Sequence, residues 1–225
     1  VTLLKSLIYF ITAVKNKFFR NFFSHELILI QIIKESAPYY FLSLMMLPIV
    51  YLSNNFLVIN SNENELGYFN FTNKLLIPFT TIFGFALSAI FPNISTLWIK
   101  SKEKFYSLIQ KGLISYMLFI SFLIFCFNLF IKDFLIQFFS NDYINSVEVI
   151  KIHIWYVFLM SINSFIGTVW GAANKEKLLL FASALNFCLT TPLLWLTSFY
   201  GAYYLSLGYL VSFALFEIYL FIHFF

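Results

Sequence analysis

Long apolar stretches alternate along the chain with short polar connections. Six stretches are long enough to cross a bilayer, and they cover residues 37–60, 68–99, 112–131, 150–173, 178–200 and 203–225. A spanning helix needs about 20 residues, and hydrocarbon offers no hydrogen-bond partner to an open backbone group. Apolar residues run continuously within each stretch, whereas they would alternate in a barrel strand. Each stretch is therefore predicted to be a transmembrane helix.

The residues before the first complete stretch follow a different pattern. Residues 1–14 are apolar but too short to span a bilayer, and Lys5 interrupts them, so they are predicted to be the end of a truncated transmembrane helix. Residues 15–36 mix basic and aromatic side chains. They are predicted to form a cytoplasmic linker, either an amphipathic helix on the membrane surface or a solvated chain. Residues 37–225 complete an all-α, polytopic membrane helix bundle with a lobe of six transmembrane helices.

The composition agrees with a membrane protein and excludes several other classes. Hydrophobic residues make up 61% of the chain and charged residues 11%, whereas a soluble protein has about 45–50% and about 25%. The formal net charge of +4 is spread along the chain, so no basic patch indicates a nucleic-acid partner. The expected partner is the lipid bilayer.

The basic residues predict the orientation of the bundle. Ten of the 14 lysines and arginines lie in the first, third and fifth connections: Lys15, Lys17, Arg20, Lys34, Lys100, Lys102, Lys104, Lys111, Lys175 and Lys177. By the positive-inside rule these connections face the cytoplasm, and so does the carboxyl terminus. We expect residues 100–111 to form a basic loop, and residues 133–149 to contain a short helix at the outer interface.

The stretch 68–99 carries the most informative polar pattern. Asn70, Asn73, Lys74 and Thr81 fall on one face of a helix, because steps of three and four residues return to the same side. Such a face either lines a water-filled cavity or packs tightly against another helix. A packing seam has no need of an ammonium group, so Lys74 favours the cavity, although its side chain could instead reach the interface.

Other spans contain isolated polar residues and prolines. The further candidates for the substrate cavity are Asn54, Asn55, Asn163 and Asn186. Glu217 is a carboxylate deep in a span, where an ionisable group indicates function by default, so it is a candidate coupling group; the alternative is a position near the cytoplasmic interface, where a carboxylate needs no special role. Pro48, Pro78 and Pro192 each remove a helical hydrogen bond and are candidate hinges.

No catalytic or metal-binding motif stands out in the sequence. It lacks paired carboxylates, a Gly-rich phosphate loop and a convergent Ser/His/Asp set, and its histidines are scattered, with His153 at a helix start where solvation is the simplest interpretation. We expect neither an enzyme nor a metal site. No cofactor is expected beyond protons or sodium ions that couple to transport.

The order of several motifs resembles one family of transporters. The motifs are ELGYFNFTNKLLIP at residues 65–78, IFPNIS at 90–95, ESAP at 35–38 and GAANKEK at 171–177. They resemble the polysaccharide-unit (O-antigen, Wzx-type) flippases of the multidrug/oligosaccharidyl-lipid/polysaccharide exporter superfamily. The resemblance implies two six-helix lobes around a central cavity, of which this chain corresponds to the C-terminal one.

The resemblance also implies a function and partners. Such a protein flips an undecaprenyl-pyrophosphate-linked oligosaccharide from the cytoplasmic to the outer leaflet of the bacterial inner membrane, for O-antigen or capsule assembly. The N-terminal lobe of the same protein and a polysaccharide polymerase are the expected protein partners. The alternatives are a drug or lipid II exporter of the same superfamily, and a six-helix solute-binding subunit of another transporter.

Overall fold

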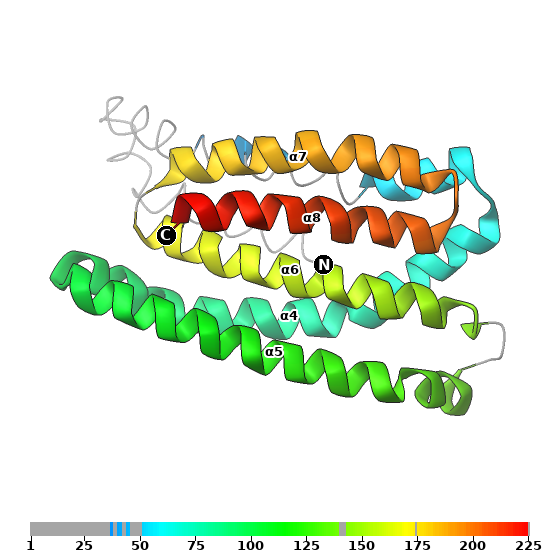
Figure 1. Cartoon of the computed structure of the whole chain (residues 1–225), viewed down its shortest axis with the longest axis horizontal. Coiled ribbons are helices and arrows are strands. Elements are labelled where there is room, and N and C mark those ends of the chain that lie inside the picture. The colour runs from blue at the N-terminus through cyan, green and yellow to red at the C-terminus, as the bar shows by residue number, and fades with distance from the viewer. Residues whose placement is uncertain are drawn as a thin grey trace, which may run out of the picture. The chain divides into compact units, whose positions relative to one another are not determined.

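A computed structural model describes residues 37, 40–41, 44–45, 51–139, 143–173 and 175–224, and Figure 1 shows their arrangement. Within this part of the chain all regular structure is helical, as the sequence predicts. The predicted truncated helix at residues 1–14, the linker at 15–36 and the hinge residue Pro48 lie outside the described residues. All described residues of the predicted first span, 37–60, are helical, and they are continuous over 51–60.

Five long helices follow this segment. They are α4 (Glu63–Lys100), α5 (Lys102–Phe138), α6 (Ser146–Ala172), α7 (Glu176–Ser198) and α8 (Ala202–Phe224). All five are long and apolar enough to cross a membrane. The chain is therefore a helical protein of the multi-pass membrane type.

Two expected features of the connections are wrong. Residues 100–111 form no loop, because Ser101 alone separates α4 from α5. The Ser101 backbone N–H donates to the Leu97 carbonyl at 2.9 Å, and its hydroxyl caps α5 by accepting from the Lys104 backbone N–H at 3.5 Å. The short helix expected after Asp133 is the continuation of α5, which runs without a break to Phe138.

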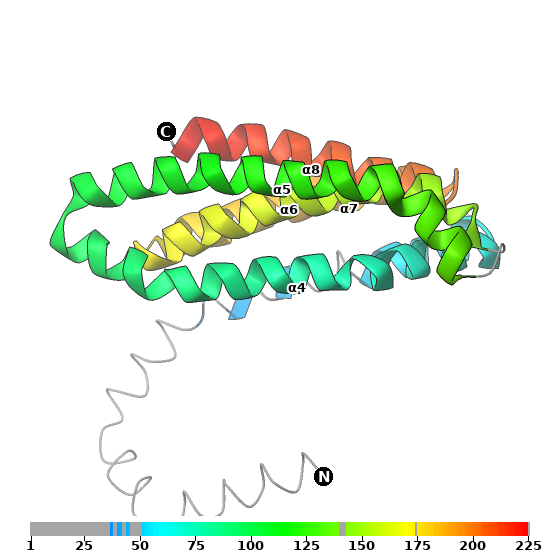
Figure 2. The same ribbon diagram turned by 90° about the horizontal axis from the view of Figure 1, so that it is seen from below.

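Helix α6 lies at the centre of the bundle. It packs most extensively against α4 and α8 and also against α5, while α7 packs mainly on α8. Figure 1 shows α7, α8 and α6 side by side, and the turned view in Figure 2 shows α4 and α5 as a long hairpin beside them. Much of α4 and α5 therefore stays open to the surroundings, as membrane helices can.

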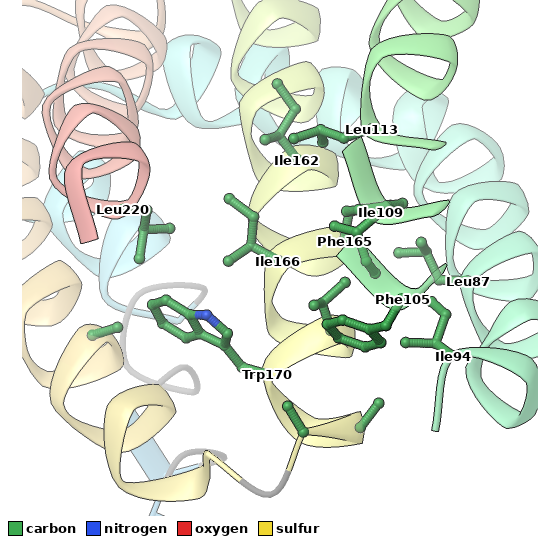
Figure 3. Packing of buried hydrophobic residues seen from close by; sticks show 14 of the residues in the cluster. Leu87, Ile94, Phe105, Ile109, Leu113, Ile162, Phe165, Ile166, Trp170 and Leu220 are labelled. Atoms are coloured by element: carbon green, nitrogen blue, oxygen red, sulfur yellow. The ribbon is translucent and has the colours of Figure 1, made fainter. Parts of the chain in front are cut away.

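Apolar side chains fill the bundle where α4, α5 and α6 meet (Figure 3). Leu87 and Ile94 of α4 meet Phe105 of α5 and Phe165 of α6, and all four are at least 95% buried. Trp170 extends this cluster from α6 toward α8. Lipid tails are as apolar as these residues, so close packing rather than expulsion of water holds such helices together.

The two ends of the bundle differ in chemistry. At one end, here called the basic end, the lysines of the α4–α5 and α6–α7 connections gather, and the Lys102 and Lys175 ammonium nitrogens lie 4.5 and 6.0 Å from the Trp98 ring centre. The opposite end, here called the aromatic end, carries the exposed Tyr200 and Tyr204 at the α7–α8 turn. Tryptophan, tyrosine and lysine at helix ends are typical of membrane interfaces.

Candidate functional site

A cavity of about 350 Å³ lies among residues 51–60, α4, α6 and α8. We call it the polar cavity. Asn54, Asn70, Asn73 and Lys74, four of the residues singled out from the sequence, lie together in its wall. The other lining residues are Ser53, Leu76, Ile77, Thr80, His153, Tyr156, Val157, Met160 and Tyr209. The structure thus brings three amides and one ammonium group to a single hollow.

Helical spacing places the α4 side of this wall. Asn70, Asn73, Lys74, Ile77 and Thr80 recur at intervals of three or four residues, so their side chains point in the same direction. Lys74 lies about 16 Å along α4 from its first residue, at 1.5 Å per residue. Within the described part of the chain its ammonium group forms no salt bridge. It is therefore a cation without a fixed counter-ion inside a membrane-spanning helix.

Pro78 modifies the backbone beside the same lysine. Proline has no N–H group, so Pro78 cannot donate the helical hydrogen bond that the Lys74 carbonyl would receive. One turn of α4 next to the polar cavity therefore lacks its regular bond. The backbone carbonyl and the side-chain ammonium group of Lys74 both belong to this turn.

The hydroxyl side chains farther toward the carboxyl end of α4 do not line the polar cavity. Thr81 is exposed and does not line the polar cavity, and its hydroxyl donates to the Ile77 carbonyl at 2.8 Å. Thr80, one residue earlier, lines the cavity instead. Ser88 is exposed as well and donates to the Phe85 carbonyl at 2.8 Å. These hydroxyl groups are satisfied by their own helix and need no water-filled surface.

A cluster of rings from α4, α6 and α8 borders the polar cavity, whose wall includes its members His153 and Tyr209. His153 is 2% exposed, and its ring centre lies 5.3 Å from Phe69 and 5.5 Å from Tyr209. Its Nδ1 lies 3.1 Å from the Ser206 hydroxyl oxygen of α8, a hydrogen bond whose direction depends on the tautomer. The interpretation of His153 as a solvated residue at a helix start is therefore wrong.

The α6 pattern contained a signal for this role. His153, Tyr156, Val157 and Met160 follow the same spacing of three and four residues as the polar face of α4. A test of that spacing on α6 would have placed His153 on one face with the three other α6 residues that line the cavity.

The remaining predicted site residues do not join the polar cavity. Asn55 is exposed and Asn163 is half-buried, and neither lines it. Asn186 is fully buried, and its Oδ1 accepts from the Thr190 hydroxyl at 2.9 Å. Glu217 is 4% exposed, and neither carboxylate oxygen has a hydrogen-bond partner among the described residues. Pro192 is an exposed residue inside α7.

A second cavity, of about 620 Å³, lies nearer the aromatic end and is here called the terminal cavity. Its wall consists of Asn62, Asn64, Glu65, Tyr68, Asn145, Glu148, Val149 and Tyr203. Along α4, α6 and α8 alike, the residues of the terminal cavity precede those of the polar cavity. Phe69, buried and stacked on Tyr209, follows the last α4 residue of the terminal cavity.

The described residues contain no group of three or more histidine, cysteine, aspartate or glutamate side chains that could hold a metal ion. No protein-family model, curated protein or solved structure matches the chain.

Proposed function

We propose that the chain is one lobe of an exporter that flips an undecaprenyl-pyrophosphate-linked oligosaccharide from the cytoplasmic to the outer leaflet. The observation that carries the proposal is the position of Lys74 in the polar cavity with Asn54, Asn70 and Asn73. A free ammonium group and three amides inside a membrane bundle are costly to keep, and such groups mark substrate pathways.

The chemistry of these side chains suits the two polar parts of that substrate. The Lys74 ammonium group is a point charge with three donors, which can bind the pyrophosphate. The three amides both donate and accept hydrogen bonds, so they match sugar hydroxyl groups. The lipid tail would stay in the bilayer beside the exposed apolar face of α4, where Ile82 and Phe85 lie.

The proposal includes an orientation and protein partners. The basic end would face the cytoplasm of a bacterial inner membrane, with the carboxyl terminus on that side. The N-terminal lobe of the same protein would complete the central cavity, and a polysaccharide polymerase would receive the product. The exporter would not be an enzyme, because it moves its substrate without changing a covalent bond.

Glu217 is the proposed coupling residue. A charged carboxylate without a partner is expensive inside a membrane bundle, so a bound proton or sodium ion would neutralise it. Loading and release of that ion on opposite sides of the membrane could then drive the helix movement. Pro78 and Pro192 interrupt the hydrogen bonding of α4 and α7, and Pro48 is a third candidate hinge.

Complementation tests the role of Lys74. The gene with Lys74→Ala is expressed in a strain that lacks its own flippase, and surface polysaccharide is measured beside the wild type. We expect at least a tenfold loss of surface polymer, since Lys74 is the one lysine among the described residues that line the polar cavity. Lys74→Arg keeps the charge and should retain part of the activity.

The matched control is Lys111→Ala, which removes an exposed lysine of α5 outside the cavity. It should leave surface polymer unchanged. Normal polymer from Lys74→Ala at normal protein level would remove the polar cavity from the export mechanism.

A further inference from the structure

The terminal cavity differs from the polar cavity in charge. The acidic side chains of its wall are Glu65 and Glu148, whereas the wall of the polar cavity holds the basic Lys74. Glu65 lies nine residues before Lys74 on α4, which is about 14 Å along the helix. A bound molecule that reached both cavities would thus meet an ammonium group at one point and carboxylates at another.

Part of the terminal cavity wall is fixed by hydrogen bonds. The Asn145 amide donates to the Tyr68 hydroxyl at 3.1 Å, and the Asn62 side chain accepts from the Glu65 backbone N–H at 3.0 Å. Glu148 pairs with Lys151 at 2.9 Å, one turn along α6. These contacts hold the wall in place without filling the cavity.

Other polar groups of the wall remain available to a ligand. Within the described part of the chain, the Asn64 amide and the Tyr203 hydroxyl form no hydrogen bond. Amides and hydroxyls both donate and accept, and carboxylates accept strongly. Such a mixed set matches a ligand that is itself rich in hydroxyl groups, while the Tyr203 ring offers a flat apolar surface for the C–H face of a sugar ring.

We propose that the terminal cavity is a binding site for neutral sugar residues. The site takes uncharged pyranosides and disfavours sugars that carry a carboxylate, because Glu65 and Glu148 repel a like charge. The proposal deepens the proposed function and rests on it, since it assigns the uncharged part of the carried glycan to a subsite apart from Lys74. A volume of about 620 Å³ falls within the range of small-molecule sites.

Direct binding of free glycans tests this site without lipid or transport. The complete protein is purified in detergent, and the affinity of a neutral tetrasaccharide methyl glycoside is measured by saturation-transfer NMR titration. Tyr203→Ala and Asn64→Ala should each weaken binding about fivefold, the contribution of one hydrogen bond. Tyr200→Ala, which removes an exposed tyrosine of the same turn outside the cavity, should change the affinity less than twofold.

A second titration tests the choice of neutral sugars. The same glycan with one terminal hexuronate should bind at least fivefold more weakly than the neutral glycan, and Glu148→Gln should reduce this difference. Glu63→Gln, at an exposed glutamate outside the cavity, should not. Equal affinity for both glycans would overturn the proposed site. Unchanged affinity for the neutral glycan in both Tyr203→Ala and Asn64→Ala would overturn it as well.

These results are separable from the export proposal. Loss of glycan affinity in Tyr203→Ala, together with normal surface polymer from Lys74→Ala, would keep the saccharide site and reject export through the polar cavity. Unchanged glycan affinity in Tyr203→Ala, together with loss of polymer from Lys74→Ala, would reject the saccharide site alone.

Discussion

The carboxylate of Glu65, at the start of α4, caps the amino terminus of α8 at Ala202. Its Oε2 accepts a hydrogen bond from the Ala202 backbone N–H at 2.6 Å. The first N–H groups of a helix have no partner within the helix and carry its positive dipole end, so an acidic acceptor is favoured there. The Asn60 amide also donates to the Ser198 hydroxyl at 2.8 Å, which ties the end of α7 to the helical residues 51–60.

Removal of the Glu65 carboxylate should destabilise the bundle. We expect Glu65→Ala to lower the free energy of unfolding by about 1–2 kcal/mol, because it leaves the Ala202 N–H without an acceptor. Glu65→Gln keeps an acceptor oxygen and should lose less. Thermal unfolding in detergent, followed by circular dichroism, measures the difference. Glu63→Ala, which removes an exposed carboxylate of the same first turn, should cost less than half as much.

Gly201 is required by the same contact. Its φ of +95° is a conformation that other residues rarely adopt, and a Cβ atom there would lie 2.7 Å from the Glu65 Oε2. Gly201→Ala should therefore lower the free energy of unfolding by about 2 kcal/mol or more, since it combines backbone strain with a steric clash.

Gly67 supplies the matched control for Gly201. A Cβ atom at Gly67 meets no atom within 4 Å, and the residue lies inside α4. Gly67→Ala should leave stability unchanged or raise it by up to about 1 kcal/mol, because alanine favours helices. If both substitutions shift the unfolding temperature equally, the Glu65 contact is not the reason for glycine at 201.

Gly208 sets how closely α7 and α8 approach each other. A Cβ atom at Gly208 would lie 2.5 Å from the Thr197 hydroxyl oxygen and 3.1 Å from its methyl carbon. Gly208→Ala should cost about 1–3 kcal/mol of unfolding free energy, the usual penalty for overpacking. Thr197→Ala removes both of these atoms, so the double variant Gly208→Ala/Thr197→Ala should be more stable than Gly208→Ala alone.

The unfolding temperatures of the two single variants and the double variant form a double-mutant cycle. Additive effects would show that the two residues do not share a contact. Gly84→Ala, with no atom within 4 Å of the added Cβ, serves as the control for a glycine-to-alanine change in a spanning helix.

The sequence was sufficient to predict the five long helices, though not all of their ends, and to place part of the polar cavity wall on one face of α4. Asn70, Asn73 and Lys74 are found from spacing alone, because each step of three or four residues on a helix returns to nearly the same direction. The same rule fails at Thr81, which its spacing places on the same side of α4 as Lys74 but which is exposed and outside the cavity. Spacing gives the side of a helix that a residue faces, but not where along the helix a cavity ends.

Contacts between helices were beyond such a prediction. Spacing within one helix cannot say which neighbour a residue faces, so the partners of His153 on α4 and α8 were not predictable. The unbroken α5 was missed for another reason. Its basic first turns suggested a loop, yet Phe105, Ile109 and Leu113 are buried at helical spacing and continue the packing past the charged residues.

The hydrogen bond between His153 and Ser206 joins α6 to α8 inside the bundle. Ser206→Ala would leave the buried His153 Nδ1 without a partner, and we expect a loss of about 0.5–1.5 kcal/mol in the free energy of unfolding. His153→Phe removes the need for that partner and keeps an aromatic ring against Phe69 and Tyr209. The double variant His153→Phe/Ser206→Ala should therefore be at least as stable as Ser206→Ala, and thermal unfolding in detergent measures all three. Independent, additive losses would show that this hydrogen bond contributes nothing to the α6–α8 contact.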